Sequence, residues 1–414
     1  MEKALLVTVD LGKREGWTAE ERSHELAELA ASAGAKVTRE EIVNRHGICP
    51  ATFVGKGKVE ELSGICKAGK INIVIFNSDL TATQQKNLEE ALAVKTIDRT
   101  QLILDIFARR AHSNEGKIQV ELAQLMYMLP RLTGKGIELS RLGGGIGTRG
   151  PGEQKLEVDR RKIRARMFKL TKDLKGLSKR RTMMRNNRER FSSLSIAIIG
   201  YTNAGKSTLL NSLTASKVIV EDRLFSTLDP TARKFILPNN QKVLFIDTVG
   251  FLDRLPHHLI EAFKATLEEV VEADLLLHVV DISHPKAYEE VAAVHRVLDE
   301  LGVKGKSIIT ALNKIDKVQD KGLIDKALGD FNNTVAISAL KREGFEELIK
   351  KVSHYIAKSV VRISLKLPVT DTKTLNIIHQ NGFVGKTEYE DDFVNIEAEL
   401  PAKVADLLKK ILDI

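Results

Sequence analysis

The sequence predicts an α/β protein with one large parallel-sheet domain, an N-terminal α/β domain, a helical hairpin and a small C-terminal α/β module. The first observation behind this prediction is a series of short apolar runs separated by amphipathic segments of helix length. Such runs are typical of buried parallel strands that helices cover on both faces. The second observation is a pair of matched apolar stripes at helical spacing, which predicts two helices that pack on each other. A chain of 414 residues is also too long for a single ordinary core.

The N-terminal α/β domain is predicted over residues 1–115. Apolar runs at 4–11 and 71–77 predict buried strands. Residues 19–34 predict an amphipathic helix that ends at a glycine. Strand and helix signals therefore alternate through this part of the chain.

The helical hairpin is predicted over residues 116–190. Its two apolar stripes are Ile118, Leu122, Leu125, Leu129 and Leu132, and Ile163, Met167, Leu170, Leu174 and Leu177. Spacings that alternate between four and three place each stripe on one face of a helix. The glycine-rich stretch LGGGIGTRGPGE, at 142–153, lies between the stripes and would form the tip of an antiparallel hairpin.

The positive charge of the chain is concentrated directly after this glycine-rich stretch. Fifteen Lys and Arg face four acidic residues between Lys155 and Arg190, a net charge of +11, whereas the whole chain carries +9. A solvated helix face is one interpretation. We favour a surface that binds a polyanion, because concentrated positive charge releases counterions from nucleic acid.

The large parallel-sheet domain is predicted over residues 191–358. Its apolar runs lie at 195–200, 242–248, 274–281, 307–313 and 334–338. The tail at 359–414 shows strand, helix, paired-strand and helix signals in that order. It therefore predicts a small α/β module, and we find no catalytic constellation in it.

The first strand of the large domain runs into GYTNAGKST, at 200–208, which opens an apolar helix. A glycine-rich turn between a strand and a helix is the setting of a P-loop, whose backbone N–H groups point at phosphate oxygens. We expect Lys206 to reach the β and γ phosphates. We expect Ser207 to ligate Mg²⁺.

Further motifs follow in order, each after a predicted strand. DTVG, at 247–250, places Asp247 near the Mg²⁺ shell and brings the backbone of Gly250 to the γ phosphate. NKID, at 313–316, places Asp316 where its carboxylate can accept hydrogen bonds from guanine N1–H and N2–H₂. Adenine offers no such pair of donors, so this carboxylate selects GTP over ATP.

Two more side chains of NKID and the SAL sequence at 338–340 are assigned to the base. Asn313 is expected to contact the guanine edge, Lys314 to pack along the base, and Ala339 to back it. The ordered motifs together predict that the parallel-sheet domain is a P-loop GTPase domain.

The segment LFSTLDPTARKF, at 224–235, lies between the P-loop and DTVG. A GTPase uses a hydroxyl in this segment to ligate Mg²⁺ and to sense the γ phosphate. Thr227 and Thr231 both fit by spacing. Phe251 follows DTVG where Ras-type GTPases place a Gln that orients the attacking water, so the water must be positioned by another group.

These motifs, with STLDPT, DTVGF and GGGIGTRGPGEQKLEVDRR, resemble the HflX family of ribosome-associated GTPases. The resemblance extends over roughly residues 1–360 and includes DRTQLILDIFARRAHSNEGKIQVELAQL. It implies ribosome-stimulated GTP hydrolysis, binding to the large ribosomal subunit, and splitting or rescue of stalled ribosomes. It also implies that Ser207 and Thr227 ligate Mg²⁺.

The resemblance carries the family's guanine-nucleotide contacts onto five stretches of this chain. They are Gly200, Tyr201, Thr202, Asn203, Ala204, Gly205, Lys206, Ser207, Phe225, Ser226, Thr227, Leu228, Asp229, Asp247, Thr248, Val249, Gly250, Asn313, Lys314, Ile315, Asp316, Ser338, Ala339 and Leu340. Within this set, catalytic roles are assigned to Asn203, Lys206, Thr227 and Gly250.

The resemblance also suggests a use for the glycine-rich stretch, since the family's hairpin projects its loop towards the peptidyl transferase region. Gly144 and Gly145 have no side-chain bulk, so the backbone can approach RNA closely. Arg149 adds a planar cation for phosphate or base contacts. Ribosomal RNA phosphates are expected along the following helix, at Arg160, Arg161 and Arg164. A second phosphate site is the alternative, although no GKS or GKT follows the loop.

Asn203 in the P-loop has two interpretations. It caps the loop, or it binds K⁺ through its side-chain oxygen, as in GTPases that it resembles and that use potassium in place of an arginine finger. Arg223 and Arg233 flank Thr227 at a distance in sequence, and Phe251 is apolar. We therefore expect K⁺ as a second cation beside Mg²⁺.

Two alternative functions follow from the residues. The first is a GTPase that acts in RNA modification or at a membrane surface, but the basic segment offers only Phe168 as an aromatic anchor. Neither Cys49 nor Cys66 lies in a catalytic context. The second is an ATP-driven RNA remodeller that uses the N-terminal domain, whose VGKGKVEEL at 54–62 is glycine-rich and basic without being a P-loop.

The remaining features indicate a cytoplasmic protein, and we expect it to be a monomer. The two cysteines show neither metal-ligand spacing nor a disulfide framework, which is typical of a reducing cytosol. The N-terminus lacks the apolar region of a signal peptide, and no run of 18 apolar residues predicts a membrane span. The expected partners are GTP, GDP, and the large ribosomal subunit with its RNA.

Overall fold

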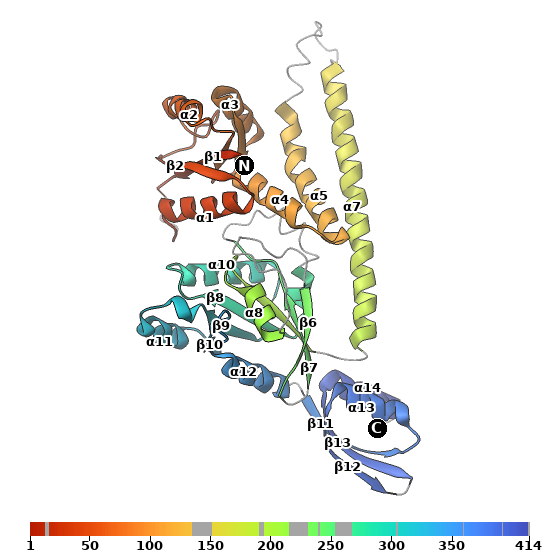
Figure 1. Ribbon diagram of the computed structural model, residues 1–414. Helices are drawn as coiled ribbons and strands as arrows, with labels where there is room; N and C mark the ends of the chain where they lie inside the picture. Colours follow the sequence, from red (N-terminus) through yellow and green to blue (C-terminus); the bar gives the residue numbers. More distant parts are fainter. Residues whose placement is uncertain are drawn as a thin grey trace. The chain divides into compact units, whose positions relative to one another are not determined.

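The computed structural model describes residues 1–12, 16–134, 151–189, 194–214, 231–238, 241–252, 267–303, 305–358, 360–390 and 392–412. These residues form two compact units, of which the first ends at Lys175 and the second begins at Gly176. The described chain contains three separate β-sheets with their helices (Figure 1). The predicted α/β class is confirmed, and the bounds of the four domains stay predictions.

The first unit begins with a four-stranded parallel sheet of order β2-β1-β3-β4. Its elements are β1 (Lys3–Asp10), α1 (Ala19–Ser32), β2 (Lys36–Asn44), α2 (Lys56–Gly69), β3 (Ile73–Phe76), α3 (Ala82–Leu92), β4 (Lys95–Asp98) and α4 (Arg99–Arg110). Helix α1 starts at a capping box in which Thr18 and Glu21 exchange side-chain and backbone hydrogen bonds. The strands predicted at 4–11 and 71–77 and the helix predicted at 19–34 are confirmed.

Helices α2 and α3 cover one face of this sheet. Alternate residues of β1, among them Leu5 and Val7, join Cys66 of α2 and Leu88 of α3 in one buried cluster. Burial raises the pKa of the Cys66 thiol. Both Cys66 and the half-buried Cys49 are free thiols, as the sequence predicts.

A buried polar cluster joins the start of the hairpin to this sheet. The first hairpin helix, α5 (Asn114–Met128), continues into the 3₁₀ helix η1 (Leu129–Gly134). Arg131 of η1 donates hydrogen bonds to the carbonyl of Leu80 at 2.7 Å and to the carboxylate of Asp98 at 3.1 Å. Its guanidinium also lies 3.4 Å from the centre of the Tyr127 ring, in a cation–π contact. Burial raises the pKa of the Asp98 carboxyl, and the charge of Arg131 opposes that rise.

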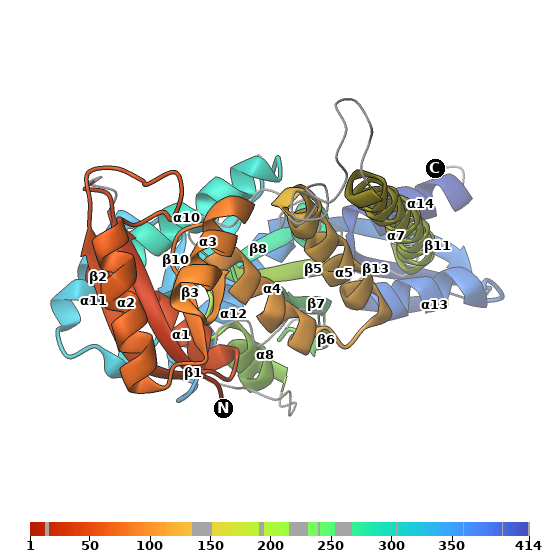
Figure 2. The ribbon, with the colours of Figure 1, turned by 90° about the horizontal axis from the view of Figure 1, so that it is seen from above.

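The hairpin is closed by the long helix α7 (Pro151–Glu189), which lies alongside α5 (Figures 1 and 2). Leu122 of α5 is buried with Leu170 and Leu174 of α7, and neighbours from both predicted stripes pack around them. The prediction was wrong for Leu129 and Leu132, because α5 ends before them and they lie in η1. Within the described residues, neither α7 nor any other helix is long and apolar enough to cross a membrane.

The second unit contains a six-stranded sheet of order β10-β9-β8-β5-β7-β6. Its elements are β5 (Leu194–Gly200), α8 (Lys206–Thr214), β6 (Thr231–Ile236), β7 (Lys242–Asp247), β8 (Leu275–Asp281), α10 (Ala287–Glu300), β9 (Ile308–Asn313), η2 (Ile315–Lys317), α11 (Lys321–Asp330), β10 (Thr334–Ala336) and α12 (Phe345–Lys358). All five predicted strands are confirmed. The sequence analysis missed β6, an antiparallel edge strand whose mostly exposed side chains form no apolar run.

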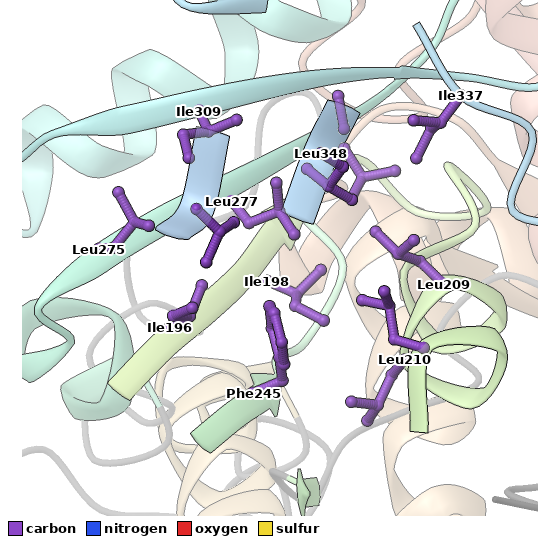
Figure 3. Close-up of a cluster of buried hydrophobic side chains, with 14 of the residues drawn as sticks. Ile196, Ile198, Leu209, Leu210, Phe245, Leu275, Leu277, Ile309, Ile337 and Leu348 are labelled. Carbon is purple, nitrogen blue, oxygen red and sulfur yellow. The ribbon is translucent and has the colours of Figure 1, made fainter. Parts of the chain in front are cut away.

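Strand β5 is buried on both faces, and its alternate residues belong to two separate hydrophobic clusters. Ile196 and Ile198 face α8 and α12 in one cluster (Figure 3). Ala197 and Ile199 face the opposite side, in a cluster with α10 residues such as Val294. This alternation explains why the run SIAIIG is apolar at nearly every position.

The end of the chain forms a three-stranded antiparallel sheet of order β11-β13-β12. Its elements are β11 (Val360–Pro368), α13 (Thr372–Asn381), β12 (Phe383–Glu390), β13 (Phe393–Pro401) and α14 (Ala402–Leu412). Both helices pack on this sheet around a core that includes Ile378, Ile396 and Leu408. The predicted order of strand, helix, strand pair and helix is confirmed.

The hairpin contact generates a stability prediction. Leu170 is 2% exposed, so Leu170→Ala should destabilise the packing of α5 on α7 by about 2–5 kcal/mol. Hydrogen exchange of the α5 amides in the full-length protein measures this loss. Phe168→Ala, two residues away at a side chain that is 75% exposed, serves as the control and should leave exchange unchanged. Equal protection in the two variants would contradict the pairing.

Candidate nucleotide-binding site

The predicted P-loop lies between the end of β5 and the start of α8, and its path requires glycine at two positions. Gly200 has φ +151°, and a Cβ atom there would lie 2.2 Å from the carbonyl oxygen of Val279. Gly205 has φ +95°, and its Cβ would lie 2.3 Å from Nδ2 of Asn313. The loop therefore packs tightly on β8 and β9, which fixes its backbone at the N-terminus of α8.

Lys206, the first residue of α8, is buried at the centre of the loop. Its Nζ donates hydrogen bonds to the carbonyls of Tyr201 at 2.7 Å and Gly200 at 3.2 Å. Burial lowers the pKa of Lys206 to about 8, although nearby carboxylates oppose the shift. A phosphate group beside Nζ would favour the charged lysine, so the site suits an anion.

Ser207 and Asp247 form a pair of hard oxygen donors beside Lys206. The Ser207 hydroxyl donates to the Asp247 carboxylate at 2.6 Å, and both side chains are buried. No group of three His, Cys, Asp or Glu residues that could hold a metal exists among the described residues. This donor set fits Mg²⁺, which is commonly bound through one or two carboxylates with phosphate oxygens and water.

The DTVG turn is tied to the P-loop by its backbone. Thr248 anchors the turn by donating its hydroxyl to the carbonyl of Ile198 at 2.7 Å. The N–H of Phe251 donates to Gly200, and the carbonyl of Phe251 accepts from Thr202. A Cβ on Gly250 would lie 2.8 Å from Cγ2 of Thr202, so this glycine packs directly on the P-loop.

The side chain of Phe251 points away from the predicted phosphate site. It is 1% exposed and packs in the core with Ala197, Ile199 and Val270. The Phe251 ring is therefore a core group, and it supplies no hydrogen bond to a water molecule.

Asn313, at the end of β9, joins two loops through its side-chain amide. Its Nδ2 donates to the carbonyl of Ala204 at 2.8 Å, and its Oδ1 accepts from the N–H of Ala339 at 2.9 Å. The amide keeps a second N–H and a second lone pair, so the expected contact of Asn313 with the guanine edge stays a prediction. The two hydrogen bonds hold the P-loop and the SAL turn at one edge of the sheet.

The other predicted base-binding residues lie on the same loops. Asp316 accepts a hydrogen bond from the Ser338 hydroxyl at 2.6 Å, which orients its carboxylate. Lys314 has φ +64°, and its Nζ forms an ion pair with Asp281 at 2.7 Å. Ala339 is buried, whereas Leu340 is exposed.

Two residues of this site were missed by the sequence analysis. Asp281 ends β8 and holds Lys314. Ser212 of α8 donates to the carbonyl of Ala339 at 2.7 Å and so fixes the SAL turn. The position of Asp281 after an apolar strand was a usable signal, whereas nothing in the local sequence marks Ser212.

The remaining predicted residues fall into three groups. Phe225, Ser226, Thr227, Leu228 and Asp229, together with Gly144, Gly145 and Arg149, lie outside the described residues. Arg160, Arg161 and Arg164 lie on α7, where the first is half-buried and the other two are exposed. Asn203 has φ +61°, a conformation that asparagine tolerates better than most residues. The backbone of the loop therefore favours asparagine at this position.

Comparison with known proteins agrees with this geometry. Family models match the chain at residues 20–108 (GTP-binding GTPase N-terminal), 110–188 (GTP-binding GTPase Middle Region), 195–314 (50S ribosome-binding GTPase) and 322–413 (HflX C-terminal domain). A crystal structure of SsGBP in complex with GDP is 27% identical, covers 86% of this chain and 99% of its own, and has a TM-score of 0.50.

Two curated relatives cover most of the chain. The GTPase HflX of Caldanaerobacter subterraneus subsp. tengcongensis is 46% identical over 99% of this chain and 94% of its own length. The GTPase HflX of Escherichia coli is 38% identical over 91% of this chain and 89% of its own length. The chain therefore belongs to the HflX family of GTP-hydrolysing proteins.

Proposed function

We propose that this GTPase is a Mg²⁺-dependent, guanine-selective switch that binds the large ribosomal subunit and promotes splitting or rescue of stalled ribosomes. The observation that supports its nucleotide chemistry is the joining of the P-loop, NKID and SAL loops through Asn313. This contact brings Lys206 and Asp316 to the same edge of the sheet. One molecule of GTP could then place its phosphates at Lys206 and its guanine base at Asp316.

The roles of the phosphate-binding residues follow from their burial and charge. Lys206 would exchange its two carbonyl partners for phosphate oxygens, and α8 would direct its N-terminal N–H groups at the same phosphates. Ser207 and Thr227 would ligate Mg²⁺, Asp247 would hold the Mg²⁺ shell through water, and the charge of the ion would neutralise charge on the phosphates. The backbone N–H of Gly250 would meet the γ phosphate.

Phe251 is buried in the core and cannot orient the attacking water. Other groups must position this water and stabilise the negative charge that develops on the phosphates. We propose that Asn203 binds K⁺ beside the phosphates, where fixed positive charge lowers the barrier to hydrolysis. The ribosome would supply the remaining stabilisation, and a partner that contributes such charge accelerates GTP hydrolysis by about 10³–10⁵ in known systems.

The hairpin supports the proposal that the partner is ribosomal RNA. The segment 155–190 carries +11, more than the net charge of the whole chain. Arg161 and Arg164 are exposed on α7. The family model that matches residues 195–314 is described as a 50S ribosome-binding GTPase, which also suggests a large-subunit partner.

Base selection is tested at Asp316. Asp316→Asn should weaken GTP binding by about a hundredfold or more, since hydrogen bonds to a charged group contribute about 1.5–3 kcal/mol each. Binding of xanthosine triphosphate should improve, because O2 of xanthine is a hydrogen-bond acceptor and the introduced amide can donate to it. Asp325→Asn, at an exposed position of α11, is the matched control. Unchanged GTP affinity in Asp316→Asn, measured by calorimetry, would refute the assignment of NKID.

Ribosome coupling is tested at the glycine-rich stretch. Deletion of 143–150, or Arg149→Ala, should leave GTP hydrolysis by the free protein intact and reduce large-subunit-stimulated hydrolysis about tenfold or more. Arg109→Ala, an exposed arginine outside the hairpin, is the control. Subunit splitting on sucrose gradients provides a second measurement. Loss of GTP binding by the folded deletion protein would count against a separate RNA-binding role.

The cation role is tested by Asn203→Gly, which keeps a backbone that tolerates φ +61° and removes the side-chain oxygen. Hydrolysis by the unaltered protein with ribosomes should be faster in KCl than in NaCl at equal ionic strength, about tenfold if the ion is worth one ordinary charged contact. The glycine variant should bind GTP and lose this difference. Equal rates of the unaltered protein in the two salts would return Asn203 to a purely structural role.

A further inference from the structure

The outward side of α7 carries five residues that share one face. Their spacings of three, four, four and three residues place them in a line along the helix. They are Arg161, Arg164, Phe168, Lys172 and Lys175, and all five are exposed. We call this set the α7 outer stripe.

Phe168, at the centre of the outer stripe, is not used by the hairpin core. Its side chain is 75% exposed, whereas Leu170 and Leu174 are buried against Leu122 of α5 on another face of α7. The Phe168 ring is therefore available for a contact outside the hairpin, and its meaning depends on the charged residues beside it.

The cations of the outer stripe do not include Arg166, the arginine that joins α7 to α5. Arg166 forms a two-pronged ion pair with Glu121 of α5, with distances of 2.6 and 2.8 Å. Asp173, the one acidic residue between 161 and 175, is not at a stripe position. The stripe is therefore a run of positive charge with an aromatic ring in its middle.

This combination fits a single RNA strand better than the other polyanions. The face of an unpaired base stacks on an aromatic ring, and the phosphates on either side attract cations. Arg164 and Lys172 lie one turn before and one turn after Phe168, about 12 Å apart along the axis, which spans about three stacked nucleotides. A base pair inside a duplex exposes no such face, and one phenylalanine is too little apolar surface for a membrane.

We propose that Phe168 is a stacking platform for an unpaired RNA base and that Arg164 and Lys172 bind the adjoining phosphates. This site rests on the proposed binding of ribosomal RNA by the hairpin and adds what the hairpin recognises. It assigns to α7 a preference for unpaired nucleotides, which charge alone would not produce.

The first test compares single-stranded and duplex RNA of about twelve nucleotides, a length within the usual site size. Full-length protein is titrated into labelled RNA, and binding is followed by fluorescence anisotropy. Phe168→Ala should weaken single-strand binding by about 5- to 100-fold, the range expected for one stacked base, and change duplex binding little. Phe168→Trp should retain the affinity. Met183→Ala, at another exposed apolar position of α7, is the matched control and should bind normally.

The salt dependence separates stacking from charge. Arg164→Gln and Lys172→Gln should each lower the slope of log affinity against log salt by about 0.7 for a single strand. Phe168→Ala should lower the affinity and leave this slope unchanged. In a Trp17→Phe background, which removes the single native tryptophan, the fluorescence of Phe168→Trp should be quenched by the single strand and not by the duplex.

The outcomes distinguish this site from the proposed function. If Phe168→Ala binds both RNAs as the unaltered protein does while Arg164→Gln and Lys172→Gln weaken them, the stacking site is refuted and RNA binding by the hairpin stands. Equal loss for single strand and duplex, or binding to anionic vesicles that depends on Phe168, would also refute it. If the unaltered protein binds neither RNA nor purified large subunits, the proposed function itself fails.

Discussion

The arrangement of the nucleotide site depends on two hydrogen bonds of the Asn313 side-chain amide. One residue at the end of β9 donates to Ala204 and accepts from Ala339, so the loops after β5, β9 and β10 are stabilised together. Leaving a buried amide partner unsatisfied costs about 1–3 kcal/mol, which is enough to favour this arrangement strongly. The tight approach of Gly205 to Asn313 shows that the P-loop can only close this contact without a side chain at that position. Asparagine at the first position of NKID therefore builds the site.

The buried charges of this site prepare it for a charged ligand. Lys206 is held by backbone carbonyls and has a lowered pKa, while Asp247 is engaged by Ser207. Phosphate and a divalent cation would replace these internal contacts with stronger opposite-charge contacts. The backbone of Phe251 is hydrogen-bonded to the P-loop and its ring is in the core, so this residue joins the P-loop to the core of the domain.

Helix α7 packs on α5 with one face and exposes a row of cations on another. Leu170 and Leu174 pack on α5, and Arg166 is neutralised by Glu121. The cations of the outer stripe lie on a different face of the helix and are exposed. A helix with charge on most of its surface has little amphipathic character as a whole, so its stability in the hairpin depends on this narrow apolar contact.

The sequence by itself determined the α/β class, five strands of the six-stranded sheet, most of the two hairpin stripes and the nucleotide motifs. It could do so because apolar period, glycine turns and strand-end polar residues are local signals. The tertiary structure decided which of those strand ends meet. It gave Asn313 its loop contacts, buried Phe251 in a core, added the edge strand β6, and ended α5 before Leu129. These features depend on partners far away in the chain, and no local pattern records the distance between two loops or which side of a long helix is covered.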